Sequence, residues 1–123
     1  MSAVFLRTCA VAMALLIGGC ASPAPVVTPE VPGGVPLVAS GTSFVQKSVE
    51  VHADQAFSIV FENRDGEPHN VSISAPDGRA QVFVGETITG PAAKVYAVPA
   101  LPAGAYTFRC DVHPEMKGTL VSS

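Results

Sequence analysis

The segment CDVHPEM, from Cys110 to Met116, carries three side chains that bind metal ions in proteins. Cys110 supplies a thiol, His113 an imidazole three positions later, and Met116 a thioether three positions after that. Residues three apart cannot share one face of a strand, so these groups converge only if the chain turns between them, and Pro114 favours such a turn. The competing interpretation is a strand that ends in an inert thiol. A metal clamp also needs a further ligand from elsewhere in the chain.

Alternation of apolar and polar residues indicates where that ligand lies. The segments AYTFRC, HNVSIS and MKGTLV alternate with a period of two, which predicts strands with one face toward a core. Cys110 ends the apolar row of the first, His69 begins that of the second, and Met116 is in phase with that of the third. The opposite row of the second segment is polar and contains Asn70, Ser72 and Ser74. The candidate ligands are therefore expected at strand tips, at one end of a sandwich.

The strands that must position these residues recur through the chain. Further alternating segments are SFVQKSVEV, AFSIVFEN, AQVFV and KVYAV, and turns rich in Gly, Pro and Asp separate them. No segment has a convincing helical period. Seven or eight short strands within residues 42–123 predict an all-β domain, an antiparallel sandwich or barrel.

The chain begins with the layout of an export signal. Residues 1–20 contain one positive charge at Arg7, then an apolar run, then small residues, and the run is too short to span a bilayer. Its tail, IGGC, resembles the lipobox of bacterial lipoproteins. That resemblance implies loss of residues 1–19 and acylation of Cys20, and hence an exported protein, lipid-anchored to a bacterial membrane at its periplasmic or extracellular face. An ordinary signal peptide cut nearby is the alternative.

A proline-rich segment follows Cys20. Residues 21–40 contain five prolines and two glycines with one charge, so we expect neither helix nor paired strand there. Residues 20–41 are thus predicted to be the lipidated cysteine and an extended tether, which leaves residues 42–123 as the domain.

Charge and cysteine content narrow the possible functions. The chain has a net charge of −3 and no basic run in the domain, so a nucleic-acid partner has no electrostatic basis. The domain has one cysteine and cannot form an internal disulfide. Because a domain of this size has a hydrophobic core of marginal stability, a bound metal is the obvious additional source of stability.

The donor types indicate which metal. One thiolate, two imidazoles and a thioether match the trigonal set with a weak axial Met that holds blue copper. Zinc prefers a second thiolate, a third imidazole or a carboxylate, and gains little from Met. A zinc site using Asp111 or Glu115 would place charged residues where the loop should face water.

The segments EPHNVSI and YTFRCDVHPEMKGTLV resemble the ligand segments of the cupredoxins, the type 1 copper proteins, and the short Cys-to-Met spacing is most similar to amicyanin. The resemblance covers nearly all of residues 42–123 and implies a Greek-key β-sandwich with one copper ion. It makes His69, Cys110 and His113 equatorial ligands and Met116 the axial one. It also places Asn70 and Pro114 directly behind the ligands, with Asn70 steadying the loop by hydrogen bonding.

The same resemblance implies a carrier of single electrons between redox partners, and the predicted anchor at Cys20 places it at the outer side of a bacterial membrane. We expect a monomer that docks transiently through an apolar patch around the exit imidazole, formed by His113, Pro114, Pro99 and Leu101. An enzyme with further copper centres would need more histidines, and His52 is the only spare one in the chain. Two other interpretations remain at this point: a copper-handling protein that sequesters or delivers the ion, and a metal-free surface module.

Overall fold

The computed structural model describes residues 18–19 and 25–123. Residues 1–17 and Cys20 lie outside the described residues, and with them most of the predicted signal and the predicted acylation site. The part of the chain that the structure describes contains no helix, and so no helix that could cross a membrane.

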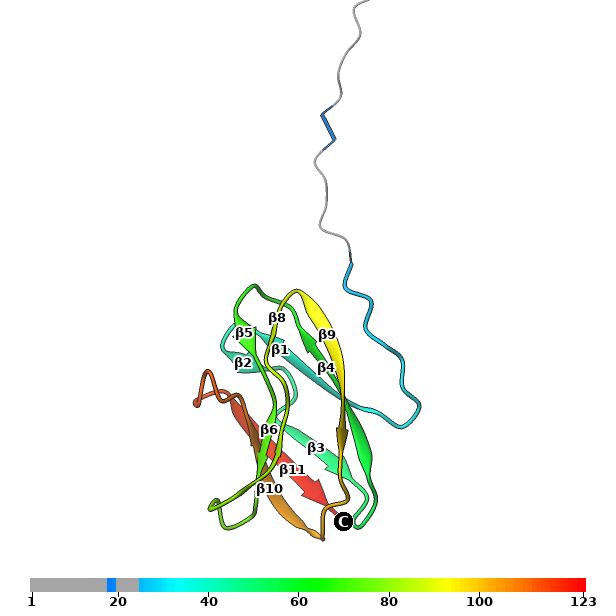
Figure 1. The fold of residues 1–123 in the computed structure, drawn as a ribbon, viewed down its shortest axis with the longest axis vertical. Helices are drawn as coiled ribbons and strands as arrows, with labels where there is room; N and C mark the ends of the chain where they lie inside the picture. The colour runs from blue at the N-terminus through cyan, green and yellow to red at the C-terminus, as the bar shows by residue number, and fades with distance from the viewer. Residues whose placement is uncertain (1–17, 20–24) are drawn as a thin grey trace, which may run out of the picture.

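The described residues form eleven strands, and eight of them have three or more residues (Figure 1). Their bounds are β1 Val35–Ser40, β2 Ser43–Phe44, β3 Ser48–Val51, β4 Phe57–Asn63, β5 Pro68–His69, β6 Ser72–Ser74, β7 Gln81–Val84, β8 Ile88–Thr89, β9 Ala92–Val98, β10 Gly104–Arg109 and β11 Lys117–Ser122. The expected all-β fold is confirmed.

The strands make two main sheets that face each other across the core. The first has the order β2-β1-β4-β9 and the second the order β3-β11-β10-β6-β7, while β5 and β8 form a separate two-stranded ladder. Most neighbours are antiparallel, as expected, but β1 is parallel to β4 and β3 is parallel to β11. The two parallel pairs join strands that are distant in sequence, so each main sheet contains one long-range parallel pairing.

Apolar residues from both sheets fill the space between them. In β4 the alternation puts Ile59 and Phe61 fully inside, and Phe108 of β10 is fully buried opposite them. Phe44 packs edge-on against Phe61 and Phe108, at ring-centroid separations of 6.5 and 5.2 Å. Such edge-to-face pairs add about 0.5–1.5 kcal/mol each to the free energy gained by burial alone. The core therefore holds the two sheets in a fixed relation.

The tether predicted for residues 20–41 is wrong in its second half. Val35–Ser40 is strand β1, which pairs with β4 over five residues and with β2 over two. Leu37 and Ala39 are fully buried in the core. Pro36 does not prevent this pairing, because β2 contacts only the last two residues of β1, so the proline lies where that side of the strand has no neighbour. The folded domain therefore begins before residue 35, not at residue 42.

Candidate metal centre

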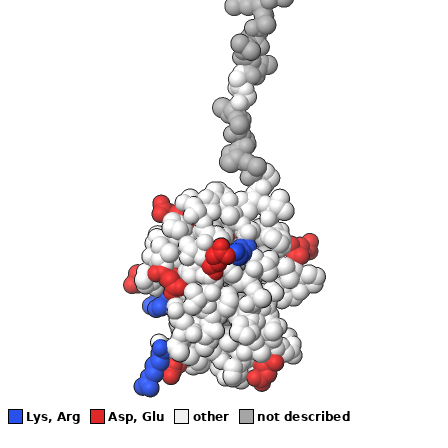
Figure 2. Space-filling view, in the orientation of Figure 1, with Lys and Arg blue, Asp and Glu red and all other residues white. Residues whose placement is uncertain are grey.

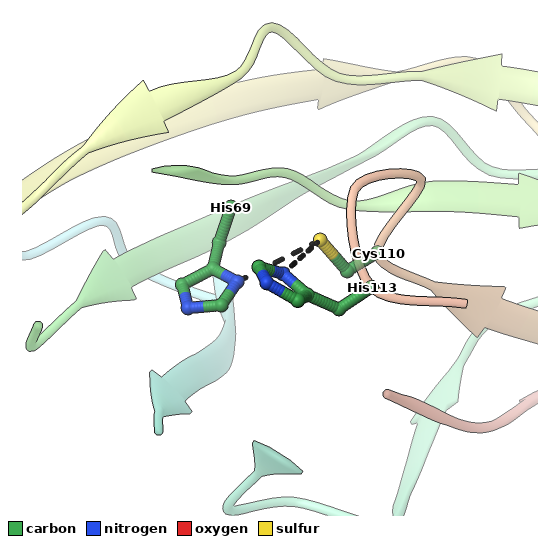
Figure 3. A group of neighbouring side chains, drawn as sticks. All are labelled: His69, Cys110 and His113. Atoms are coloured by element: carbon green, nitrogen blue, oxygen red, sulfur yellow. Dashed lines mark hydrogen bonds between the residues drawn. The ribbon is translucent and has the colours of Figure 1, made fainter. Parts of the chain in front are cut away.

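Two segments, the short strand β5 and the loop between β10 and β11, bring the candidate ligands together at one end of the sandwich. His69 ends the short strand β5, Cys110 follows the last residue of β10, and His113 lies in the loop that leads to β11. Figure 3 shows the His69 ring and the Cys110 and His113 side chains pointing toward one another from opposite segments. Cys110 and His69 are fully buried, whereas His113 is half-buried.

The donor atoms form a compact triangle. Cys110 Sγ lies 3.7 Å from His69 Nδ1 and 3.9 Å from His113 Nδ1, and one ligand atom from each residue falls within 4.8 Å of the others. An ion with bonds of about 2.0 Å to nitrogen and about 2.3 Å to sulfur holds such atoms roughly 3.5–3.8 Å apart. The two sulfur–nitrogen distances are therefore close to those around one bound ion.

Met116 closes the loop that carries two of these ligands. The Cys110 N–H donates to the Met116 carbonyl oxygen at 2.9 Å, and the Met116 N–H donates to the His113 carbonyl oxygen at 2.9 Å. The Met116 side chain is 1% exposed, so its thioether lies in the interior. These two bonds supply the turn that the three-residue spacing required.

Asp65 determines which nitrogen of His69 faces the cluster. His69 Nε2 donates to Asp65 Oδ1 at 3.0 Å, because a carboxylate can only accept. The proton therefore resides on Nε2, and the lone pair of Nδ1 is directed toward Cys110. Asp65 also accepts the Glu67 N–H at 3.2 Å, which fixes its carboxylate. Sequence reasoning assigned this residue only to a turn; an acid four positions before the histidine was the available signal.

A model of the cupredoxin-like domain matches residues 8–122 of the chain. The chain belongs to the cupredoxin family. Amicyanin from Paracoccus denitrificans is 28% identical over 98% of the chain and 97% of its own length. The amicyanin structure from Paracoccus versutus has a TM-score of 0.60 and 27% identity, and it covers 80% of this chain and 91% of its own.

Auracyanins share the fold of this cupredoxin at lower identity. The protein from Roseiflexus castenholzii has a TM-score of 0.65 and 15% identity, and it covers 80% of this chain and 99% of its own. Auracyanin A from Chloroflexus aurantiacus, a "blue" copper protein, has a TM-score of 0.64 at 18% identity, covering 73% of this chain and 98% of its own. His69, Cys110, His113 and Met116 form the cluster in this cupredoxin, and their donor set is suited to one copper ion.

Asn70 links the ligand loop of this cupredoxin to the sheet. Its Oδ1 accepts the Asp111 N–H at 2.8 Å, and its Nδ2 donates to Asp111 Oδ2 at 2.9 Å and to the Gly85 carbonyl oxygen at 3.0 Å. The hydrogen bond to the ligand loop that the family resemblance implied is therefore present.

Asp111 is a residue that sequence reasoning missed, because a charged residue after a core strand was expected to face water. Its carboxylate instead accepts hydrogen bonds from Asn70 and Ser72, and from Gln81 Nε2 at 2.9 Å. The polar row of Asn70, Ser72 and Ser74, opposite the core-facing residues, is buried as well. Burial tends to raise the pKa of Asp111, but these hydrogen bonds outweigh it, so the pKa lies below its ordinary value.

We expect Asp111→Ala to destabilise the metal-free protein by about 1–3 kcal/mol, because the buried Ser72 loses its acceptor and the buried Asn70 loses one of two. Urea unfolding followed by fluorescence or circular dichroism measures the change. Asp111→Asn keeps the shape of the side chain and one acceptor oxygen, and it should lose less stability than Asp111→Ala. Asp77→Ala, on an exposed turn, is the matched control for removal of a carboxylate. An Asp111→Ala midpoint equal to that of the Asp77→Ala variant would contradict this role.

Only some of the residues expected to form an apolar patch around His113 lie beside it. Pro99 follows the end of β9, whose last residue, Val98, pairs with the first residue of β4. Leu101 is 4% exposed, and its carbonyl oxygen accepts from the Asp54 N–H and from Ser122 Oγ, far along the sheet from the ligand loop. Both residues therefore lie at the other end of the sandwich, and the prediction that they border His113 is wrong.

The surface beside His113 is built from other residues. A hollow there is lined by Thr42, Val112, His113, Pro114, Glu115 and Met116. Val112 is 44% exposed, and Pro114 is exposed as well. Apolar groups thus surround the half-buried imidazole, although they are contributed by the ligand loop itself and by the turn before β2.

Proposed function

We propose that this cupredoxin is a type 1 copper protein that carries single electrons between redox partners and is not an enzyme. The observation that carries the proposal is the buried Cys110 sulfur within 3.7 and 3.9 Å of two imidazole nitrogens, with Met116 buried in the same loop. Copper bound at such a donor set supplies a one-electron couple.

The residues around the cluster hold the donor atoms still. Asp65 fixes the His69 ring, the Asn70–Asp111 hydrogen bonds fix the loop, and the two bonds that Met116 makes close it. Because Cys110 and His69 are fully buried, water has no direct access to their donor atoms. A site held in this way favours rapid electron exchange, since little rearrangement accompanies a change of charge.

The half-buried imidazole of His113 is the exit that this geometry favours. It is the ligand that reaches the surface, and Val112 and Pro114 surround it with apolar side chains. A small apolar patch of this kind suits a weak, brief interface with a redox protein, at the low end of interface sizes. On the face drawn in Figure 2, acidic and basic side chains are scattered rather than gathered.

The proposed location is the outer side of a bacterial membrane, with the protein as a monomer anchored through acylated Cys20. Support comes from the apolar run before Cys20, the small residues that precede it and the proline-rich segment that follows. Mass spectrometry of the protein from a membrane fraction tests the anchor: an N-terminal cysteine carrying acyl chains is expected, and an unmodified mature end would contradict it.

The spectrum of the oxidised copper protein tests the site. We expect an intense blue colour and a narrow parallel copper hyperfine splitting in the electron paramagnetic resonance spectrum. A colourless protein with an ordinary tetragonal copper spectrum would overturn the type 1 assignment. A reversible reduction potential, together with retention of copper(I) against a competing chelator, then separates an electron carrier from a protein that sequesters or delivers copper.

Met116→Leu should retain copper and the blue colour while the reduction potential rises. Leucine replaces a buried thioether by an isosteric alkyl group, so packing is kept, while a weak donor that favours the oxidised ion is lost. Protein-film voltammetry measures the potential. Complete loss of copper binding would show that Met116 is more than a weak axial donor.

A further inference from the structure

The chain before β1 doubles back on itself. The Gly34 N–H donates to the Val31 carbonyl oxygen at 2.8 Å, which closes a four-residue turn. Gly33 has φ of 71° in this turn, a conformation that glycine adopts readily and most residues do not. Upstream of the turn, the segment runs back beside the first sheet, as the cyan trace in Figure 1 shows. We call residues 25–34 the strap.

The strap covers the outer face of β4. Val60 points away from the core, since its neighbours Ile59 and Phe61 point into it, yet Val60 is only 8% exposed. A Cβ at Gly34 would lie 2.8 Å from Val60 Cγ2 and 3.2 Å from Val31 Cβ, so turn and strand are in close contact. Farther along, Thr28 Oγ1 donates to Glu62 Oε2 at 3.1 Å. The strap thus touches the strand at two successive outward residues.

These contacts run toward the metal end of the domain. The residue after Glu62 is Asn63, whose Nδ2 donates to the Ile88 carbonyl oxygen at 3.0 Å. Ile88 in turn pairs with the ligand His69. The strap therefore proceeds from Val60 to Glu62 in the direction of the metal cluster, whereas the C-terminus lies at the other end (Figure 1).

A docked strap shortens the free chain between the domain and Cys20, and it moves the point at which this chain leaves the domain. Eight residue steps separate Cys20 from Thr28, and they can span at most about 26–29 Å. Fourteen steps separate Cys20 from Gly34, which would allow about 46–50 Å if the strap were detached. If the strap were detached, the free chain would start at the end of the domain away from the metal. The domain could then turn any of its faces toward the anchor. A docked strap holds the metal end within the shorter distance.

We propose that the strap turns the metal end toward the anchoring membrane, so that the surface around His113 fits a redox partner held in that same membrane. The membrane part of this inference rests on the proposed anchor at Cys20 and on the proposed electron carriage. The docking of the strap on β4 depends on neither of them.

Strap docking is tested in a soluble protein of residues 21–123 with copper(I) bound, which is diamagnetic. A nitroxide at Val27→Cys, an 86% exposed position, should broaden the amide signals of Glu62 and Ala93 several-fold more than those of Ser58 and Ala97. The double variant Thr28→Ala, Val31→Ser should remove the difference. Equal broadening of both pairs in the otherwise unchanged protein would overturn docking.

Orientation is tested with the protein of residues 20–123 joined through Cys20 to a maleimide lipid in phosphatidylcholine vesicles. The copper(I) protein gives one electron to a ferrocenium-headgroup lipid in the same vesicle, or to soluble ferricyanide as a control oxidant. The strap variant should react several-fold more slowly with the lipid oxidant and equally fast with ferricyanide. An unchanged ratio of the two rates would overturn the orientation.

The two proposals fail in distinguishable ways. No electron exchange with either oxidant contradicts the proposed function, whereas normal exchange with an unchanged ratio contradicts only the orientation. An unacylated mature end in the cell removes the membrane anchor but leaves the nitroxide result intact.

Discussion

Cys110→Ser is expected to abolish the intense blue colour of the oxidised protein. The colour of a type 1 site arises from charge transfer between a thiolate and copper, and Cys110 is the one free thiol among the described residues. Serine has nearly the same size, so the core around this fully buried position is kept while the thiolate is lost. Absorption and electron paramagnetic resonance spectra of the copper-loaded variant measure the change, with an ordinary copper spectrum as the expected result.

The control for this substitution lies two residues away. Val112→Ser introduces the same side chain at a 44% exposed position of the ligand loop, and it should leave the blue band unchanged. Protein of residues 21–123 is used for both variants, so that Cys20 cannot serve as a substitute ligand. A blue band that persists in Cys110→Ser would show that the sulfur ligand is not Cys110.

A shortened protein that begins at residue 42 is expected to be largely unfolded without copper. It lacks β1, which lies between β2 and β4 and contributes the fully buried Leu37 and Ala39 to the core. Loss of a single buried leucine side chain costs about 2–5 kcal/mol, and a small domain has only about 5–15 kcal/mol in total. Removal of the whole strand also exposes the edge of β4. Circular dichroism and the dispersion of amide proton signals measure the fraction folded.

The matched control begins at residue 31. It keeps β1 and the turn that closes with the bond between Val31 and Gly34, and we expect a cooperative urea transition. If the protein that begins at residue 42 unfolds at the same urea concentration, β1 is not part of the stable domain. The domain boundary expected from proline content would then stand.

The position of the upstream ligand could be predicted because it depends on a local rule. Alternation in HNVSIS put His69 in phase with Val71 and Ile73, and all three are fully buried. The same rule does not reveal that Asn70 and Ser72, on the opposite row, are buried too. Asp111 arrives there from a loop some forty residues later, and no local pattern records that contact.

The proline content led to a wrong prediction of where the domain begins, for a related reason. Pro36 removes one donor from β1, which matters only where a neighbouring strand needs it. That need depends on where β2 and β4 lie, not on the residues around Pro36. The prediction that the apolar segment near Leu101 borders His113 was wrong for the same reason. Only the direction of β9 shows that this strand ends away from His113.

By itself, the sequence determined the all-β class, the donor types of the metal site and the turn between Cys110 and Met116. These follow from side-chain chemistry and short-range periodicity, which a linear chain displays directly. The tertiary structure alone decided the tautomer of His69, the hydrogen-bond partners of Asp111, the residues that surround His113 and the end of the domain from which the strap leaves. The contacts of Asp111 and the place from which the strap leaves depend on the register between segments distant in sequence, and that register results from packing the two sheets around one core.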